Sequence, residues 1–398
     1  MDTNKLLELD LLAKEEGRHY VKRRQRYYDN IITSLGRHFT GIVGPRGSGK
    51  TVLLKQIASQ RENSFYVSVD TLEDINLFDL AKTLIERYKI NYLFLDEIHF
   101  RKNFESELKR IFDFLSVHVV FTSSVALAMI ESAYDLSRRV QLLTIYPFSF
   151  REYLLFKKDV NLSPLTLEDI LLKKWTPEHL QYGYLFEDYL KGGLHPFSLE
   201  EPDPLSLLKN ILQKIIHKDI PLIAKLHTEE ITILEKLLEF VGRSAVEGIN
   251  YSSVSKNIGV TQYKGEQYIK LFQKSFVLNP VFPFGTNVLR EPKVLMALPY
   301  RLLYKPFDEA IGALREDFCV EALLISNINF SYLKTKRGMK TPDFLIKDEH
   351  REIVIEVGGR GKGREQFKDI TVKNKIRLVH SDDTKGNKRP LFLLGYLI

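Results

Sequence analysis

The sequence predicts an α/β fold whose core is a five-stranded parallel sheet with helices on both faces. Two observations support this prediction. The run G-P-R-G-S-G-K-T at 44–51 stands between an apolar strand pattern and an apolar helix pattern. Four further apolar strand patterns follow it and alternate with helical patterns, and such alternation requires parallel strands joined by crossover helices.

The run at 44–51 matches G-x-x-x-x-G-K-[ST], the pattern of a phosphate-binding loop. A strand is expected at 38–43 and a helix at 51–57, so that loop N–H groups and the helix N-terminus converge on phosphates. Lys50 is expected to reach the β and γ oxygens of ATP, and Thr51 to give its hydroxyl to Mg²⁺. The cofactor-binding candidates in the loop are Gly44, Pro45, Arg46, Gly47, Ser48, Gly49, Lys50 and Thr51.

Two carboxylates follow the third expected strand, at 92–95. A continuous apolar run suits a strand that is buried on both faces, and the C-terminal end of such a strand lies beside the phosphate loop. We expect Asp96 to support Mg²⁺ and Glu97 to polarise the attacking water. The alternative is that the two acids only begin the next helix. The other strands are expected at 64–69, 118–122 and 139–145.

The fourth strand ends in T-S-S at 122–124, where Ser123 is a candidate to contact the γ-phosphate or to orient the water. Ahead of the fifth strand, Arg138 and Arg139 form an arginine pair. An arginine on a subunit surface could stabilise the transition-state charge on a neighbour's nucleotide.

The length of 398 residues exceeds what one hydrophobic core holds, and predicts two or three domains. An apolar content of 44% and a charged content of 27% are ordinary for globular proteins. The single cysteine, Cys319, cannot form an internal disulfide, which fits a reducing compartment. No apolar stretch approaches a membrane span and no signal-peptide pattern begins the chain, so a cytoplasmic location without a membrane partner is expected.

The formal net charge of +7 is concentrated in one segment. Residues 360–389 contain ten Lys/Arg and four acids, a net of +6. Two interpretations stay open for this segment, a solvated surface and a binding site for a polyanion.

The expected domains are a phosphate-loop core at 1–147, a helical lid at 148–203, a winged-helix region at 204–300 and an α/β domain at 301–398. An S-x-x-E capping box at 149–152 begins the lid, and Gly192-Gly193 interrupts its helical pattern.

Residues 204–283 show the pattern helix, helix, turn, helix and a short β element, which resembles a winged helix. Thr261 is expected to cap the helix at 262–275, and residues 276–282 would form the wing. The nucleic-acid candidates on that helix are Lys264, Lys270 and Lys274. Such modules read DNA or serve for packing, and both interpretations stay open.

The C-terminal third combines a helix at 309–327 with strands near 332–335, 341–346 and 352–357. Its acids Glu321, Asp343 and Glu356 could gather around a hard metal ion. Metal-assisted phosphodiester cleavage would also use a lysine two positions after the glutamate, and that position is Gly358.

Together these motifs resemble the prokaryotic AAA-superfamily ATPases that carry a winged helix and a PD-(D/E)XK endonuclease-like C-terminal domain. The supporting segments are Arg23-Arg24, 44–51, 95–99, 122–124, 136–139, 147–152, Gly192-Gly193, and Pro342-Asp343 with Glu356. The resemblance implies a sheet of order 5-1-4-3-2, ATP and Mg²⁺ bound at subunit boundaries of a homo-oligomer, and an arginine finger that Arg139 matches best.

The sequence departs from this family pattern at two places. His195 adds a residue before Pro196 in the lid motif, which weakens the expectation that the lid senses nucleotide directly. The E-x-K motif has become Glu356-Val-Gly358. Lys362 or Arg364 could take the missing role, but we favour a degenerate nuclease whose basic loop, with Arg360, Lys362 and Arg364, is retained for binding.

The leading interpretation is an ATP-hydrolysing, oligomeric enzyme that couples turnover to rearrangement on nucleic acid, with DNA as the expected kind. Nuclease turnover is not expected. Two alternatives stay open, a nucleotide-dependent switch that acts on a protein partner and an ATP-gated, metal-dependent endonuclease.

Overall fold

The computed structural model divides into two compact units, Met1–Pro147 and Phe148–Ile398, here the N-terminal and C-terminal units. The nucleic-acid candidates Arg360, Lys362 and Arg364 lie outside the described residues. Those described are 3–33, 36, 38–72, 75–124, 136, 138–224, 226–285, 291–333, 341–347, 351–358, 372 and 374–397.

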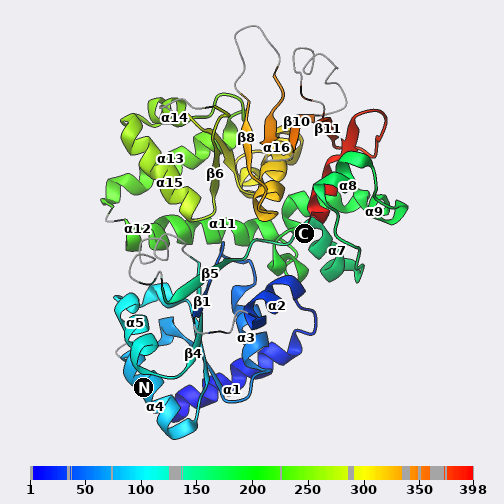
Figure 1. Cartoon of the computed structure of the whole chain (residues 1–398). Helices are drawn as coiled ribbons and strands as arrows, with labels where there is room; N and C mark the ends of the chain where they lie inside the picture. The colour runs from blue at the N-terminus through cyan, green and yellow to red at the C-terminus, as the bar shows by residue number, and fades with distance from the viewer. Residues whose placement is uncertain are drawn as a thin grey trace. The chain divides into compact units, whose positions relative to one another are not determined.

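The N-terminal unit contains the predicted parallel sheet (Figure 1). Every neighbouring pair of its strands is parallel, and the order is β2-β3-β4-β1-β5, which confirms the predicted order 5-1-4-3-2. The strands are β1 (Phe39–Val43), β2 (Ser64–Ser68), β3 (Tyr92–Asp96), β4 (His118–Ser123) and β5 (Val140–Thr144). The helices are α1 (Thr3–His19), α2 (Gln25–Thr33), α3 (Lys50–Ala58), α4 (Leu77–Tyr88) and α5 (Phe104–Phe114).

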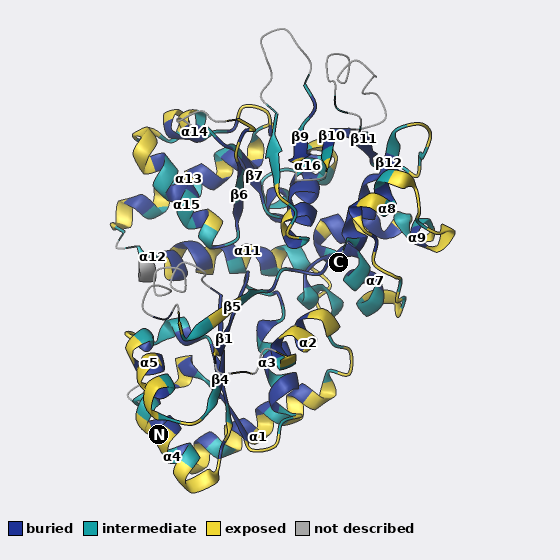
Figure 2. Ribbon diagram, in the orientation of Figure 1, coloured by how far each residue is buried: buried dark blue, intermediate teal, exposed yellow. Residues whose placement is uncertain are grey.

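Alternation along the strands builds one hydrophobic core on each face of this sheet. In β3, Leu93 and Leu95 pack with α4 and α5, whereas Phe94 packs with α2 and α3. Val120 in β4 likewise faces α2 and α3. Because successive strand side chains point to opposite faces, a continuous apolar run fills both cores. Strands β1 and β4 are accordingly buried in Figure 2, whereas the edge strand β5 is half-buried to exposed and the helices expose their outer sides.

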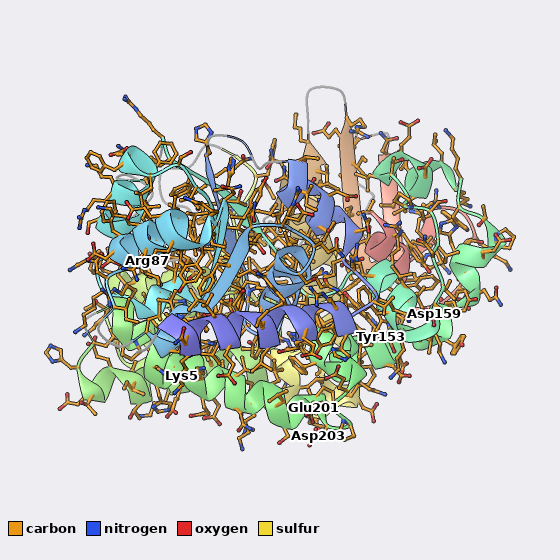
Figure 3. The ribbon with its side chains drawn as sticks, turned by 90° about the horizontal axis from the view of Figure 1, so that it is seen from below. Lys5, Arg87, Tyr153, Asp159, Glu201 and Asp203 are labelled. Atoms are coloured by element: carbon orange, nitrogen blue, oxygen red, sulfur yellow. The ribbon has the colours of Figure 1, made fainter. Side chains whose placement is uncertain are left out.

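Helix α1 covers the open edge of the sheet beside β2. Asp10 Oδ1 accepts a hydrogen bond from the Tyr66 N–H at 2.7 Å, and Lys14 Nζ donates to the Ser64 carbonyl at 2.6 Å. These side chains satisfy backbone groups that an edge strand otherwise leaves unpaired. Lys5 marks the beginning of α1 in Figure 3.

The C-terminal unit contains the remaining elements. Its helices are α7 (Phe150–Lys158), α8 (Leu167–Leu172), α9 (Pro177–Gln181), α10 (Phe186–Asp188), α11 (Pro204–Lys214), α12 (Ile220–Ile223), α13 (Thr228–Arg243), α14 (Tyr251–Ile258), α15 (Gln262–Lys274) and α16 (Phe307–Ile325). Its strands are β6 (Leu278–Val281), β7 (Lys293–Met296), β8 (Phe330–Tyr332), β9 (Phe344–Lys347), β10 (Glu352–Gly358), β11 (Asn374–Val379) and β12 (Lys388–Pro390).

Two hydrophobic cores organise this unit. One lies mainly within 205–304, where α13, α14 and α15 pack with the antiparallel pair β6-β7. The other joins the predicted lid to the C-terminal sheet: the ring of Phe150 lies 5.9 Å from that of Phe392 and 5.8 Å from that of Tyr396. The lid residues therefore share a core with the end of the chain.

The C-terminal sheet has the order β12-β11-β10-β9-β8. Strands β8, β9 and β10 pair antiparallel, and β11 and β12 continue the sheet in parallel. Helix α16 packs on the face that carries Ile353, Ile355 and Val357. The prediction of a second α/β region is therefore confirmed. Within the described ranges, no helix combines the length and the apolar character needed to cross a bilayer.

Candidate nucleotide-binding site

The loop between β1 and α3 requires glycine at three positions. Gly47 and Gly49 have φ angles of 77° and 84°, in the left-handed region that glycine tolerates best. A Cβ on Gly44 would lie 2.0 Å from the carbonyl oxygen of Ile145. The glycines therefore allow the backbone to turn tightly beneath the N-terminus of α3.

Lys50 directs its charge into this loop. Its Nζ donates to the carbonyl oxygens of Gly44 and Pro45, each at 2.9 Å, and the side chain is buried. Arg24 braces the loop from outside by donating to the Ser48 carbonyl at 3.0 Å and the Tyr146 carbonyl at 2.6 Å. A buried ammonium beside a helix N-terminus is a favourable place for an anion.

Asp96 lies beneath α3, where four side chains meet. Thr51 Oγ1 donates to its Oδ2 at 2.8 Å, Tyr66 donates to the same oxygen at 3.0 Å, and Thr122 Oγ1 donates to Oδ1. Burial raises the pKa of Asp96, the charge of Glu97 raises it further, and these hydrogen bonds oppose the rise. A hydroxyl and a carboxylate in contact form an oxygen donor set that suits Mg²⁺.

Glu97 has a left-handed backbone conformation with φ 54°. Such a conformation costs a non-glycine residue on the order of 1 to 3 kcal/mol and concentrates at functional sites. The Glu97 N–H donates to Thr122 Oγ1 at 2.9 Å, and Glu97 Oε1 lies 3.7 Å from a guanidinium nitrogen of Arg46. The side chain is 20% exposed, so water can reach it.

His99, which the sequence does not mark as a site residue, has a side chain that is only 2% exposed. Its Nδ1 lies 3.2 Å from Glu97 Oε2 and 3.3 Å from Ser123 Oγ. Ser123 ends β4 opposite Val43, the last residue of β1, so the polar end of β4 borders the loop. The signal in the sequence was the place of His99 two residues after Glu97. Thr122 and Tyr66 carried no comparable signal.

Arg139 lies at the edge of the sheet opposite to the phosphate loop. Its carbonyl accepts a hydrogen bond from the N–H of Phe39, where β1 begins, whereas the loop follows the end of β1. A five-residue strand separates these edges by roughly 15 Å. The guanidinium binds Asp113 with Nε and one terminal nitrogen, at 3.0 and 2.9 Å.

Comparison with known proteins identifies the fold that carries this site. Residues 36–154 match the family described as AAA domain. The N-terminal unit is an AAA-type P-loop domain. A second match, over residues 184–297, is to a domain of unknown function, DUF8612, which extends from the predicted lid through the predicted winged-helix region.

A relative similar along nearly the whole chain is the uncharacterized protein MJ1637 of Methanocaldococcus jannaschii. It is 28% identical, over 98% of this chain and 91% of that protein. Two solved structures are more distant: the Aeropyrum pernix ORC1 protein in complex with DNA and the Thermotoga maritima RuvB branch migration motor. They have TM-scores of 0.29 and 0.30 at 12% and 15% identity, and cover 75% and 68% of this chain and 92% of each of theirs.

The three acids predicted as a second metal site are not brought together. Glu321 on α16 accepts the Leu298 N–H at 2.9 Å, and Asp343 accepts the Val357 N–H at 2.7 Å. Glu356 lies between Ile355 and Val357, which face α16, so it points to the opposite face of the sheet. Among the described residues, no group of three or more His, Cys, Asp or Glu side chains is arranged to hold a metal ion. The structure therefore does not place Glu321 with the other two acids, and the second metal site stays a prediction.

A lysine pairs with one acid of α16, Glu316. Lys293 Nζ lies 2.5 Å from Glu316, and both side chains are nearly buried. Burial by itself lowers the pKa of Lys293, but the charges of Glu316 and Asp343 outweigh it and raise that pKa. Lys293 therefore offsets the negative charge of Glu316 and Asp343.

The basic candidates for nucleic-acid binding are partly committed to internal contacts. Lys264 lies 2.8 Å from Glu230 and holds the pKa of that carboxyl at about 2, and Lys270 lies 2.6 Å from Glu266. Lys274 is the last residue of α15. Within the basic segment, Arg389 is buried and donates to the carbonyl of Ile170 at 2.7 Å. Arg389 is therefore committed to an internal contact.

Proposed function

We propose that this protein hydrolyses ATP at the AAA domain with Mg²⁺ as cofactor. The observation that carries the proposal is the contact between Thr51 and Asp96 beneath the buried ammonium of Lys50, with Glu97 beside it. These are a phosphate ligand, a metal-binding oxygen pair and a base in one place. The glycine cradle and the oxygen donor set fit both the phosphates and the ion.

Each residue has a separate part in this proposal. Lys50 neutralises phosphate charge, and Thr51 with Asp96 holds Mg²⁺, which when bound draws electron density from the phosphate oxygens. Glu97 accepts a proton from the attacking water, for which its partial exposure is suited. Ser123 orients that water or contacts the terminal phosphate from the end of β4.

The test compares Lys50→Ala and Glu97→Gln. Lys50→Ala should lose nucleotide binding, whereas Glu97→Gln should keep binding and lose phosphate release. Lys55→Ala is the matched control, because Lys55 lies on the same helix and its ammonium pairs with Glu16 at 2.6 Å. Equal ATP affinity of Lys50→Ala and the unaltered protein by calorimetry would contradict the assignment.

We further propose that the protein is a homo-oligomer in which Arg139 acts on the nucleotide of a neighbouring subunit. The position of Arg139, at the sheet edge away from its own loop, supports action in trans. Asp113 would have to release the guanidinium when the neighbour's phosphate is engaged. The Arg139 guanidinium would thus exchange the Asp113 carboxylate for a phosphate of the neighbour's nucleotide.

We propose nucleic acid, with DNA as the expected kind, as the partner on which turnover acts. The net charge of +7 supports this proposal, as does the excess of ten Lys/Arg over four acids in residues 360–389. The test is the ATPase rate with and without double- and single-stranded DNA across a salt series. Stimulation that weakens with salt is the expected result, since phosphate contacts release counterions.

A protein-directed switch is the second candidate, and one observation favours it. Glu291 occupies the N-terminus of α14, where its carboxylate accepts the Ser252 N–H at 3.3 Å and the Gln262 amide at 2.8 Å. A nucleic-acid phosphate approaching that helix end would meet this negative charge. An ATPase rate that is indifferent to both forms of DNA would favour this candidate.

A further inference from the structure

We propose that His99 is a positioning residue that holds the Glu97 carboxylate and links it to the polar end of strand β4. The proposal rests on the proposed ATP hydrolysis and adds a residue to it. His99 would not touch nucleotide itself. It would act by fixing one oxygen of the base.

The two oxygens of Glu97 have different surroundings. Oε2 lies 3.2 Å from His99 Nδ1 and accepts a hydrogen bond from Ser124 Oγ at 3.2 Å. Oε1 instead faces Arg46 of the phosphate loop, at 3.7 Å. One oxygen is thus anchored on the β4 side, and the other is directed toward the loop, where a water could be deprotonated.

The imidazole itself is held firmly. His99 lies in the short 3₁₀ turn Ile98–Phe100, in which Ile98 is fully buried in the core beneath the sheet. Its ring lies 4.4 Å from the ring of Phe100. Moving the imidazole would therefore disturb packing. It can hold the carboxylate of Glu97, a residue with a strained backbone, in a fixed position.

The contacts of His99 reach β4 at two positions. Nδ1 lies 3.3 Å from Ser123 Oγ, and Nε2 lies 3.5 Å from Ser124 Oγ. Ser123, at the end of β4, is in register with Val43 at the start of the phosphate loop. A shift of this end of β4 would therefore displace the Glu97 carboxylate through the His99 imidazole. Glu97, His99 and the two serines thus form one polar network across β3 and β4.

The experiment replaces His99 by Ala, Asn and Gln in the full chain and measures kcat and KM for ATP together with nucleotide affinity. Asn places its amide nitrogen near the position of Nδ1, and Gln places it near Nε2. His99→Ala should reduce kcat by roughly 10- to 100-fold while nucleotide affinity stays within about twofold, since only the base loses its position. His99→Asn should recover most of the rate, and His99→Gln much less.

His118→Ala is the matched control, because His118 is a histidine at the other end of β4, away from Ser123, where it stacks on Tyr92. It should leave the rate unchanged. Ser123→Ala combined with His99→Ala should cost less than the product of the two single effects, because both remove parts of one network.

Three outcomes would overturn the proposal: an unchanged kcat in His99→Ala, an equal loss of nucleotide affinity, or no recovery in a stably folded His99→Asn. Thermal unfolding of each variant separates loss of position from loss of fold. If the unaltered protein binds ATP but releases no phosphate, the proposed function fails instead, and the two failures are thereby distinguished.

Discussion

The N-terminal and C-terminal units arrange their acidic side chains in opposite ways. Asp96 is the last residue of β3 in a parallel sheet and Glu97 follows it, and every such strand ends at the same edge, so the acids meet the phosphate loop. Glu356 lies inside β10, where its two neighbours face α16 and it does not. Acids at the ends of parallel strands converge because these ends lie at one edge of the sheet. Acids inside strands or on helices converge only if each side chain lies on the face of its element that points toward the others.

The sharpest test of this contrast compares aspartates of the two units. Asp96→Ala should reduce phosphate release by roughly 100- to 1,000-fold, because the metal loses its charged ligand. Asp343→Ala should leave phosphate release unchanged. Incubation of DNA with Mg²⁺ or Mn²⁺ should give no cleavage. Cleavage that is lost in Asp343→Ala or Glu356→Ala would break the comparison and restore Lys362 as a candidate catalytic lysine.

The second test concerns Arg139, which the sheet separates from its own loop. Arg139→Ala and Glu97→Gln should each be inactive, and a mixture of the two should regain part of the ATPase rate. A mixed interface can pair an intact loop with an intact finger. If the mixture stays inactive although labelled subunits exchange, Arg139 acts within its own subunit or supports the fold through Asp113.

The third test uses the buried Glu321 of the C-terminal unit. Burial raises the pKa of Glu321 from 4.5 to about 7. The unfolded chain therefore loses this proton first, and stability falls as the pH rises from about 4.5 to 7. The contribution lost is on the order of 3 kcal/mol. Glu321→Gln keeps an acceptor for the Leu298 N–H and should lack this fall in denaturant titrations. Parallel pH curves for the two proteins would show that Glu321 is not buried as a neutral acid.

The smallest expected effect separates two groups of basic residues. Replacing Lys362 and Arg364 by Ala should lower the slope of log DNA affinity against log salt by about 0.9 for each lost duplex phosphate contact. Lys264→Ala should change that slope little, because this lysine already pairs with Glu230. Equal slopes for all variants would mean that the basic segment is a solvated surface.

Much of the AAA domain could be predicted because its signals are local. The glycine loop, the apolar strands and the acids after β3 each occupy a few consecutive residues, and a parallel crossover topology places them. His99 was missed because an isolated histidine gives no periodic signal, and its contact with Ser123 depends on how β3 and β4 align. The shared core of the predicted lid and the C-terminal sheet was also missed, because Phe150 and Phe392 are far apart in the chain.

The sequence alone determined the phosphate loop and the parallel sheet, because consecutive residues specify them through spacing and alternation. The order of the strands was implied by the resemblance to AAA-superfamily ATPases. Only the tertiary structure decided which acids meet. Strand topology brings Asp96 to Thr51. Glu321 accepts a hydrogen bond from the Leu298 N–H, and Lys293 forms an ion pair with Glu316. The physical reason is that a side chain's partners depend on the face, register and packing of its element, which distant parts of the chain impose.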